Sequence, residues 1–591
     1  MIRIRAQTVA SCRCEVLESR LLLAAVSWTN AAGGAWNDAA NWSSNPALPG
    51  AADDVSIDLP GTYTVTLANT AASVKSVALG GTSGTQTLAV NVDLALATAS
   101  SVGANGVFSL AAGFLIGPGD LTVSGGLLWS GGAMRTSSSK TIISSSGTLS
   151  MIGAGVKQLG RILQNDGTAT WTAGNVFSGG VLNNNGSFSV NTNVTIAWLA
   201  DLGSGAFNNN ASGTLTKTGT GDLQFLVSNG SLSINNSGHA DILAGSLSYN
   251  GGGSHTQSGQ FNVKEGALLR FDASFAHGAS SSLVGEGTIT FSGSATQTFP
   301  TGTFNPTGIV NFVSGDITIN NPFTATSATI AATVNLNATT TIQSVSLTGG
   351  MLNGSGALTV TGGMTWSGGN MAGGAMTTIA VGASLNITGT GTRSANRMLQ
   401  VDGSASLEPG GGLLLVVSGL SAGAGATVNV SDNDVIVNYG DARSPTLSAI
   451  QALINSGRNG GNWLGAGMVS SAARDNPLHN TTLGAMEASD YKSVYGASAL
   501  FHGQAIDNTA VLIKYTYYGD TDFSGVVDFD DYSRIDAGFN NNRSGWLNGD
   551  LDGNGIVDFD DYSLIDQAFN TQGGSLRPIR RGIAIRPGQF R

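Results

Sequence analysis

The sequence predicts a mainly β protein, built on a right-handed parallel β-helix that is followed by a small α+β collar and a C-terminal α-helical module. Three observations predict this fold class. Short runs of alternating apolar and polar residues recur between turn-forming pairs such as Gly-Gly and Asn-Gly. Gly is abundant, at 85 of 591 residues, while only 11% of residues are charged. A block of sequence is also duplicated, which is typical of solenoids whose units pack on their neighbours.

Changes in composition divide the chain into segments, because 591 residues exceed what one compact core normally holds. We expect six of them: a sorting or signal segment (1–25), an N-terminal cap (26–70), a β-helix repeat body (71–436), a junction or collar domain (437–518), an acidic tandem module (519–571) and a disordered Arg-rich tail (572–591).

The N-terminal segment carries several Arg and one short apolar run, Leu21–Val26. This run is shorter than the roughly 7–15 residues of a signal-peptide core. However, Leu17–Leu23, which is Leu-Glu-Ser-Arg-Leu-Leu-Leu, resembles the LEPR-xLL sorting signal of many bacterial surface and secreted proteins, with Ser19 in place of Pro. The resemblance implies a secreted or cell-surface location. The two Cys of the chain, Cys12 and Cys14, also lie here, so no disulfide is expected in the body.

The body from about residue 24 to 436 consists of strand-like runs such as Tyr63–Leu67, with little helical periodicity. Residues 121–134 recur as 358–371, and residues 161–167 recur as 397–403. The body resembles the β-strand-repeat passenger regions of autotransporter-like bacterial surface proteins, which implies a parallel β-helix. An array of β-sandwiches or a propeller is the alternative architecture.

The two ends of the body have different compositions from its middle. Near the start lie Trp28, Trp36 and Trp42, which we interpret as the core of a solenoid cap, with a sugar-binding platform as the alternative. After the body, Ser444-Pro445 is a typical helix start, and an apolar face of Leu447, Ile450 and Ile454 follows before Gly457 as a C-cap. We expect this segment to be a small folded collar.

Residues 519–571 contain two acidic loops, 30 residues apart, that match the calcium-binding pattern of EF-type loops. Such loops place oxygen ligands at positions 1, 3, 5, 7, 9 and 12, with Gly at position 6, here Gly525 and Gly555. The expected ligands of two calcium ions, with backbone carbonyls at Val526 and Ile556, are Asp520, Asp522, Ser524, Val526, Asp528 and Asp531, and then Asp550, Asp552, Asn554, Ile556, Asp558 and Asp561. Because these carboxylates repel one another without metal, folding of the loops should be coupled to calcium.

Each loop runs directly into a predicted helix, and no helix is predicted before it. The apolar stripes expected to face the core are Tyr532, Ile535 and Phe539, and Tyr562, Ile565 and Phe569, with Val527 and Val557 anchoring the loops. The tandem loop-helix pattern resembles a type I dockerin, a family whose modules bind a cohesin on a partner protein. Partner choice in that family depends partly on loop positions 10 and 11, which are Phe-Asp here in both copies. A structural calcium clamp with no partner is the alternative.

The remaining residues bear on partners and on catalysis. The net charge of −11 comes mainly from the acidic module, and no broad basic surface is predicted, so nucleic acid is not expected as a partner. No stretch of 18 apolar residues occurs, so no transmembrane span is expected. Asp and Glu of the body are scattered singly, and the densest cluster is Lys264, Glu265, Arg270 and Asp272. A metal site of His239, His255 and His277 is a further hypothesis.

The sequence therefore predicts an exported, non-catalytic structural or adhesive β-helix protein. Its C-terminal module would attach it to a cohesin-like partner at the cell surface or in an extracellular complex. The alternative is a dockerin-tethered polysaccharide-degrading enzyme, a lyase or a glycoside hydrolase, with a carbohydrate as substrate. An enzyme of that kind predicts a groove with converging carboxylates.

Overall fold

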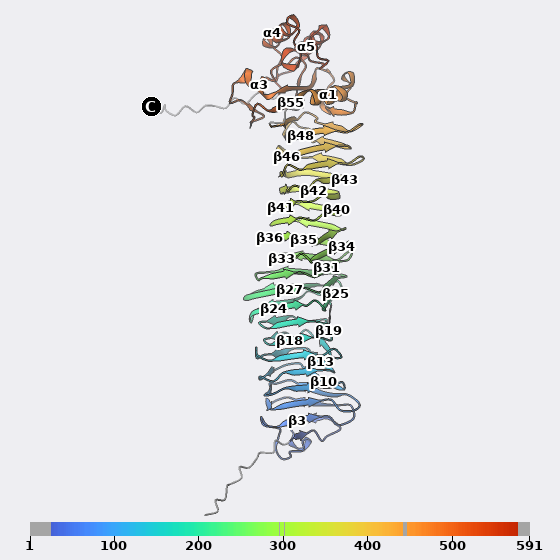
Figure 1. Ribbon diagram of the computed structural model, residues 1–591, viewed down its shortest axis with the longest axis vertical. Helices are drawn as coiled ribbons and strands as arrows, with labels where there is room; N and C mark the ends of the chain where they lie inside the picture. Colours follow the sequence, from blue (N-terminus) through green and yellow to red (C-terminus); the bar gives the residue numbers. More distant parts are fainter. Residues whose placement is uncertain (1–24, 295, 301, 441–445, 577–591) are drawn as a thin grey trace, which may run out of the picture. The chain divides into compact units, whose positions relative to one another are not determined.

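The computed structural model describes residues 25–294, 296–300, 302–440 and 446–576. The chain divides into two compact units, Met1–Thr168 and Ala169–Arg591. Strands in each unit pair in parallel to form the coils of a solenoid (Figure 1). The predicted mainly β, parallel solenoid is thus confirmed, and the sandwich and propeller alternatives are wrong. The expected sorting segment up to residue 24, the helix start at Ser444-Pro445 and the tail from residue 577 lie outside the described residues.

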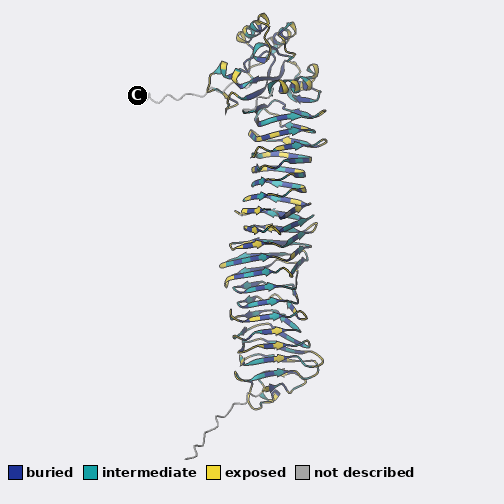
Figure 2. Cartoon of the chain, in the orientation of Figure 1, coloured by how far each residue is buried: buried dark blue, intermediate teal, exposed yellow. Residues whose placement is uncertain are grey.

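Beyond its first two strands, each coil of the first unit consists of three short strands, and each strand pairs with the strand three places later. In one ladder Val107 pairs with Thr87 on one side and with Gly126 on the other. The strands of this ladder are β7 (Gln86–Val90), β10 (Gly106–Leu110) and β13 (Gly126–Trp129), and those of a second are β9 (Ser100–Val102), β12 (Leu121–Val123) and β15 (Lys140–Ile143). Alternate residues point inward and are buried, as Figure 2 shows, because successive side chains of a strand point to opposite faces.

Three Trp form the core at the start of the first unit. The ring of Trp42 lies edge-on to those of Trp28 and Trp36, with centroids 5.0 and 4.7 Å apart. All three side chains are buried, and the Nε1 of Trp42 donates to the Trp36 carbonyl at 2.7 Å. The cap interpretation fits this arrangement, because buried rings offer no face on which a sugar could stack.

The coils of the second unit carry ladders of like side chains in their interior. Five stacked rings have adjacent centroids 5.3–5.8 Å apart, in the order Phe225, Tyr249, Phe271, Phe291 and Phe312. A second ladder is polar and buried. In it the side-chain amide of Asn184 donates to Asn209, and that of Asn209 donates to Asn236, both at 2.8 Å. Strands β42 (Thr340–Asn353) and β43 (Leu358–Met371) are longer than most others, at 14 residues each.

The duplicated sequence block has the same structural role in both copies. Arg161 is buried and donates from Nη2 to the carbonyls of Gly119 and Lys140. Arg397, its counterpart, is also buried and donates to the carbonyls of Gly356 and Met376. Each guanidinium therefore joins the backbone of neighbouring coils within its own unit.

The second unit ends in antiparallel strands and helices. Strand β55 (Ala510–Tyr517) pairs antiparallel with β50 (Asp434–Asn438) and with β52 (Thr481–Glu487). The helices gathered here are α1 (Thr446–Arg458), α2 (Ser471–Asp475), α3 (Ala488–Tyr495), α4 (Phe529–Asn540) and α5 (Phe559–Thr571) (Figure 1). Helices α3, α4 and α5 share one apolar core with β52 and β55, so the acidic module packs directly on the collar.

Helix α1 confirms Ile450 and Ile454 as buried positions, but the predicted C-cap is wrong. Gly457 lies inside the helix and is buried. A Cβ atom at this position would lie 2.0 Å from the carbonyl oxygen of Met468 in β51 (Gly467–Val469). Gly457 is therefore a residue of close helix-strand packing, and not of helix termination.

Candidate metal centre

The two acidic loops end in the same way, each as the N-terminal cap of a helix. Asp528 accepts a hydrogen bond from the Asp530 amide, and Asp531 accepts one from the Asp528 amide at 3.0 Å. This is a reciprocal capping box, and Asp558 and Asp561 form the same arrangement at α5. The last acidic position of each loop is therefore fixed by helix formation.

The first loop brings three predicted ligands together. Carboxylate oxygens of Asp520, Asp522 and Asp531 lie within 4.8 Å of one another, and all three residues are buried. Asp520 accepts hydrogen bonds from the Thr516 hydroxyl and, at 2.9 Å, from the Gly525 amide. We call these three residues the first triad.

The second loop repeats the arrangement with Asp550, Asp552 and Asp561, the second triad, whose carboxylate oxygens also lie within 4.8 Å of one another. Asp561 accepts hydrogen bonds from the amides of Leu551 at 2.7 Å and Asp558 at 3.0 Å. Asp550 is only 5% exposed, and its Oδ1 has no hydrogen-bond partner. A buried carboxylate oxygen without a donor is costly unless a cation neutralises it, so this oxygen donor set could hold a metal ion.

The remaining predicted ligands lie around the triads. The Ser524 hydroxyl contacts Oδ1 of Asp520 at 3.2 Å and the carbonyl of Val526 at 3.1 Å, so positions 1, 5 and 7 of the first loop are adjacent. In the second loop Asn554 contacts Asp552 and accepts from the Ile556 amide. Asp528 and Asp558 cap their helices and belong to neither triad. The assignment of all twelve residues as calcium ligands stays a prediction.

Burial raises the pKa of the triad carboxyl groups. The pKa is raised to about 7 for Asp531 and to about 6 for Asp520 and Asp561, and it is also raised for Asp550. Desolvation is the main cause in each case, because a buried carboxylate loses its hydration. Negative charge at these sites is therefore unfavourable until a cation compensates it.

Sequence reasoning missed two cations near the first triad. Nη1 of Arg534 lies 3.2 Å from Oδ2 of Asp522 and 3.5 Å from Oδ1 of Asp531. Lys514, on β55, donates from Nζ to the Phe523 carbonyl at 2.5 Å, and its charge lowers the pKa of Asp520 against the effect of burial. The spacing of Asp531 and Arg534, three residues apart on a predicted helix, was a usable signal for the first contact.

The buried faces of α4 and α5 differ from the apolar stripes that the sequence predicts. The buried residues are Asp531, Ile535 and Gly538 on α4, and Asp561, Ile565 and Ala568 on α5. Phe539 and Phe569, expected in the core, are 39% and 38% exposed. The predicted stripes are therefore wrong at these two positions, because the buried face turns toward the loops. Val527 and Val557 are buried as predicted.

The two helices present an aromatic face with paired contacts. The Tyr532 hydroxyl donates to Asp566 and the Tyr562 hydroxyl donates to Asp536, both at 2.6 Å. The face consists of Phe529, Tyr532, Phe539, Phe559, Tyr562 and Phe569. Its most exposed members are Phe529 at 80% and Phe559 at 77%. These are the residues at loop position 10.

The segment after α5 returns to the first loop. The side-chain amide of Gln572 donates to the Val527 carbonyl and accepts from the Val527 amide, both at 2.8 Å. The Leu576 amide donates to the Gly525 carbonyl at 2.7 Å. Residues 572–576, which we expected to be part of a disordered tail, therefore hold the first loop in place.

A scan against protein-family models finds no match, and searches of curated proteins and of solved structures find no significant match. Within the described parts of the chain, no helix combines the length and apolar character that membrane crossing requires.

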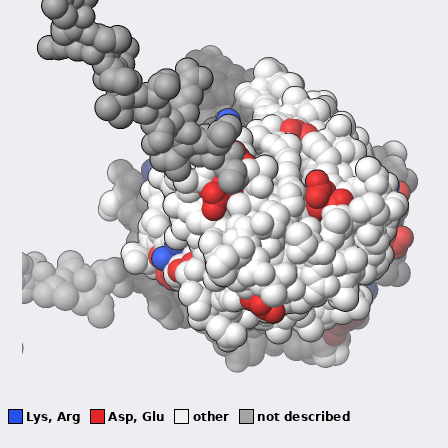
Figure 3. Space-filling model, turned by 90° about the horizontal axis from the view of Figure 1, so that it is seen from below, with Lys and Arg blue, Asp and Glu red and all other residues white. Residues whose placement is uncertain are grey.

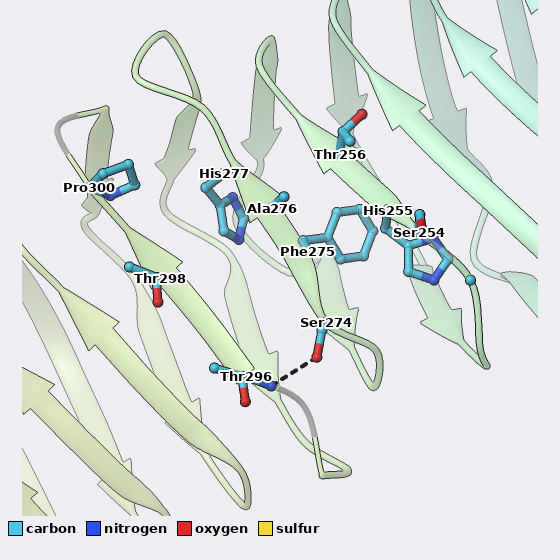
Figure 4. Close-up of a pocket in the computed structure, with 11 residues that line it drawn as sticks. Ser254, His255, Thr256, Ser274, Phe275, Ala276, His277, Thr296, Thr298 and Pro300 are labelled. Atoms are coloured by element: carbon cyan, nitrogen blue, oxygen red, sulfur yellow. Dashed lines mark hydrogen bonds between the residues drawn. The ribbon is translucent and has the colours of Figure 1, made fainter.

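The solenoid offers a pocket of ≈ 530 Å³ lined by His255, Phe275 and His277, among other residues (Figure 4). None of its described lining residues is Asp or Glu. Burial lowers the pKa of His277 to about 4 and also lowers that of His255, so both rings are neutral near pH 7. His239 is on another sheet, in β28 (His239–Ile242), and is exposed. The hypothetical three-His metal site is therefore not formed.

The densest charged cluster of the body is a surface ion pair. Nε of Arg270 contacts Oδ1 of Asp272 at 2.8 Å, while Lys264 and Glu265 are exposed. Within the described residues, the groups of three or more His, Cys, Asp or Glu that could hold a metal are the two triads. The end of the molecule seen in Figure 3 shows scattered acidic side chains and few basic ones.

Proposed function

We propose that this protein is an exported structural or adhesive solenoid, and that its C-terminal tandem loop-helix module is a dockerin-like, calcium-dependent attachment site for a cohesin-like partner protein. We further propose that the solenoid is right-handed, as nearly all parallel β crossovers are. The observation that carries the proposal is the pairing of two acidic triads with two largely exposed Phe side chains, one at the start of each following helix.

Calcium is the cation that the donor set favours. The triads offer carboxylate oxygens, and Ser, Asn and backbone carbonyl oxygens lie beside them. Calcium takes six to eight such ligands, whereas zinc and copper prefer nitrogen and sulfur. In the bound state Asp520, Asp522 and Asp531 would hold one ion, and Asp550, Asp552 and Asp561 a second. The ions would neutralise buried carboxylates and so stabilise the helix starts.

The aromatic face supports attachment rather than a purely structural clamp. A clamp requires only buried ligands, whereas Phe529 and Phe559 expose most of their surface to solvent. Exposed aromatic residues are typical of protein-protein interfaces, where they supply most of the binding free energy. Because both Phe residues directly follow a capping Asp, calcium binding would fix their positions.

The experiment that tests the proposal is capture by the immobilised full-length protein. The source cell's envelope and secreted proteins are applied in calcium and in chelator. We expect one protein to be retained in calcium and lost in chelator and with Asp531→Ala/Asp561→Ala. Its affinity should fall roughly tenfold or more with Phe529→Ser/Phe559→Ser, because aromatic anchors dominate interfaces.

Val381→Ser is the matched control, since Val381 is 84% exposed but lies in the solenoid. This variant should retain the partner as the wild type does. Capture of nothing, despite calcium binding measured by calorimetry, would show that the module is a structural clamp. If the partner is retained equally by the Phe529→Ser/Phe559→Ser variant, the attachment site lies on another face.

A further inference from the structure

The two triads are not equivalent in charge. Arg534 contacts Asp522 and Asp531 of the first triad at 3.2 and 3.5 Å, and its side chain is only 25% exposed. The residue 30 positions later, which occupies the same place beside the second triad, is Leu564. Lys514, near Asp520, likewise corresponds to Ser544. The first triad therefore has two cations of its own chain beside it, and neither has a counterpart at the second.

The hydrogen bonds differ in the same sense. The last Asp of each loop is equally satisfied, because Oδ1 of Asp531 accepts from Thr521 and Oδ1 of Asp561 accepts from the Leu551 amide. The first Asp differs: Oδ1 of Asp520 accepts from the Ser524 hydroxyl at 3.2 Å, whereas Oδ1 of Asp550 is buried without a donor. The second triad therefore has a buried oxygen that a metal ion would satisfy, and its counterpart in the first triad is already hydrogen-bonded.

We propose that Arg534 acts as a tethered cation that weakens calcium binding at the first loop, so that the second loop fills first and the first loop fills only at higher calcium. The inference rests on the calcium binding of the proposed function. A guanidinium within 3.5 Å of two ligand carboxylates repels an incoming divalent ion, and the ion must displace it to use those oxygens. The same contacts hold the first loop in its folded shape at low calcium.

The test is a calorimetric titration of the metal-stripped full-length protein with calcium chloride at pH 8. The wild type should bind in two steps whose affinities differ by about tenfold or more. Asp561→Asn should remove the tighter step, and Asp531→Asn the weaker one. Arg534→Leu, which copies the residue of the second loop, should tighten the weaker step by about tenfold. The converse change, Leu564→Arg, should weaken the tighter step by a similar factor.

Arg543→Leu is the control for net charge, because Arg543 belongs to the same module but is exposed and forms no ion pair among the described residues. It should change neither step. The inference is overturned if Arg534→Leu leaves the weaker step unaltered, or if Asp531→Asn removes the tighter one. Should Arg534→Leu fail to fold by circular dichroism, Leu564→Arg decides the question, and an unchanged tighter step overturns the inference.

The outcomes separate this inference from the proposed function. Two equal sites in the wild type would overturn only the role of Arg534. The absence of any calcium binding would overturn both the inference and the calcium dependence of attachment.

Discussion

Calcium binding to the two triads should release protons, and the number depends on the buried carboxyl groups. The pKa of Asp531 is raised to about 7, and those of Asp520 and Asp561 to about 6, mainly by desolvation. Calcium binds the carboxylate and not the neutral acid, so each group must lose any proton it holds. The release is therefore largest at a pH where these groups are partly protonated.

The magnitude follows from the pKa values. At pH 6.5 a group with a pKa of about 7 is about three quarters protonated, and one with a pKa of about 6 is about one quarter protonated. Filling both triads should then release about one proton per chain at pH 6.5. At pH 8 the same groups are almost fully ionised, and the release should fall to about a tenth of a proton.

The assay is calorimetric calcium titration in two buffers that differ in ionisation enthalpy, such as Pipes and imidazole at pH 6.5. The slope of observed enthalpy against buffer enthalpy counts the protons. Asp530→Asn is a suitable control, because Asp530 is exposed and outside both triads, and the count should not change. Release near zero at pH 6.5, with both sites filled, would refute the reasoning, since it would mean that burial leaves the metal-free carboxyls ionised.

Three further predictions concern stability, each measured by thermal unfolding of the full chain with circular dichroism. In chelator the midpoint temperature of the transition that involves the module should fall as pH rises from 5.5 to 8. The buried carboxyls have a higher pKa in the folded state than the value of about 4 in the unfolded state, so they stabilise the fold while protonated, and this stabilisation is lost as they ionise between pH 6 and 7. Calcium at pH 8 should restore the midpoint. Gly457→Ala should destabilise by about 2 kcal/mol or more, since its Cβ would lie 2.0 Å from the Met468 oxygen, while Gly573→Ala, with open space around it, should be nearly neutral. Asn209→Leu should cost about 2 kcal/mol by leaving buried ladder partners without hydrogen bonds, and Asn208→Leu, on the partly exposed side of the same strand, should cost less than about 1 kcal/mol.

Much of the solenoid could be predicted because its signals are local. Alternation along a strand such as Tyr63–Leu67 depends only on neighbouring residues, and the observed burial follows it. The duplicated block likewise predicted equivalent structure, and Arg161 and Arg397 do bond to corresponding carbonyls. The ladder of Asn184, Asn209 and Asn236 was not predicted, because the spacing between coils varies and sets which residues meet.

Predictions failed where two distant segments approach each other. Gly457 was expected to end a helix, and the position of Met468 instead requires it inside one. Phe539 and Phe569 matched a helical stripe, but the loops and β55 cover the neighbouring face and leave both rings partly exposed. Periodicity shows that a helix has an apolar side, and does not show which part of that side another segment covers.

The sequence by itself determined the parallel solenoid and the two acidic loops, because a strand and a twelve-residue loop are specified by residues close together in the chain. Only the tertiary structure decided how the loops differ. Arg534 meets Asp522 across a loop, and Lys514 reaches the first loop from β55, so the charge at that triad depends on packing. Two loops with the same spacing thus acquire different electrostatic environments, since charge acts through space and not along the sequence.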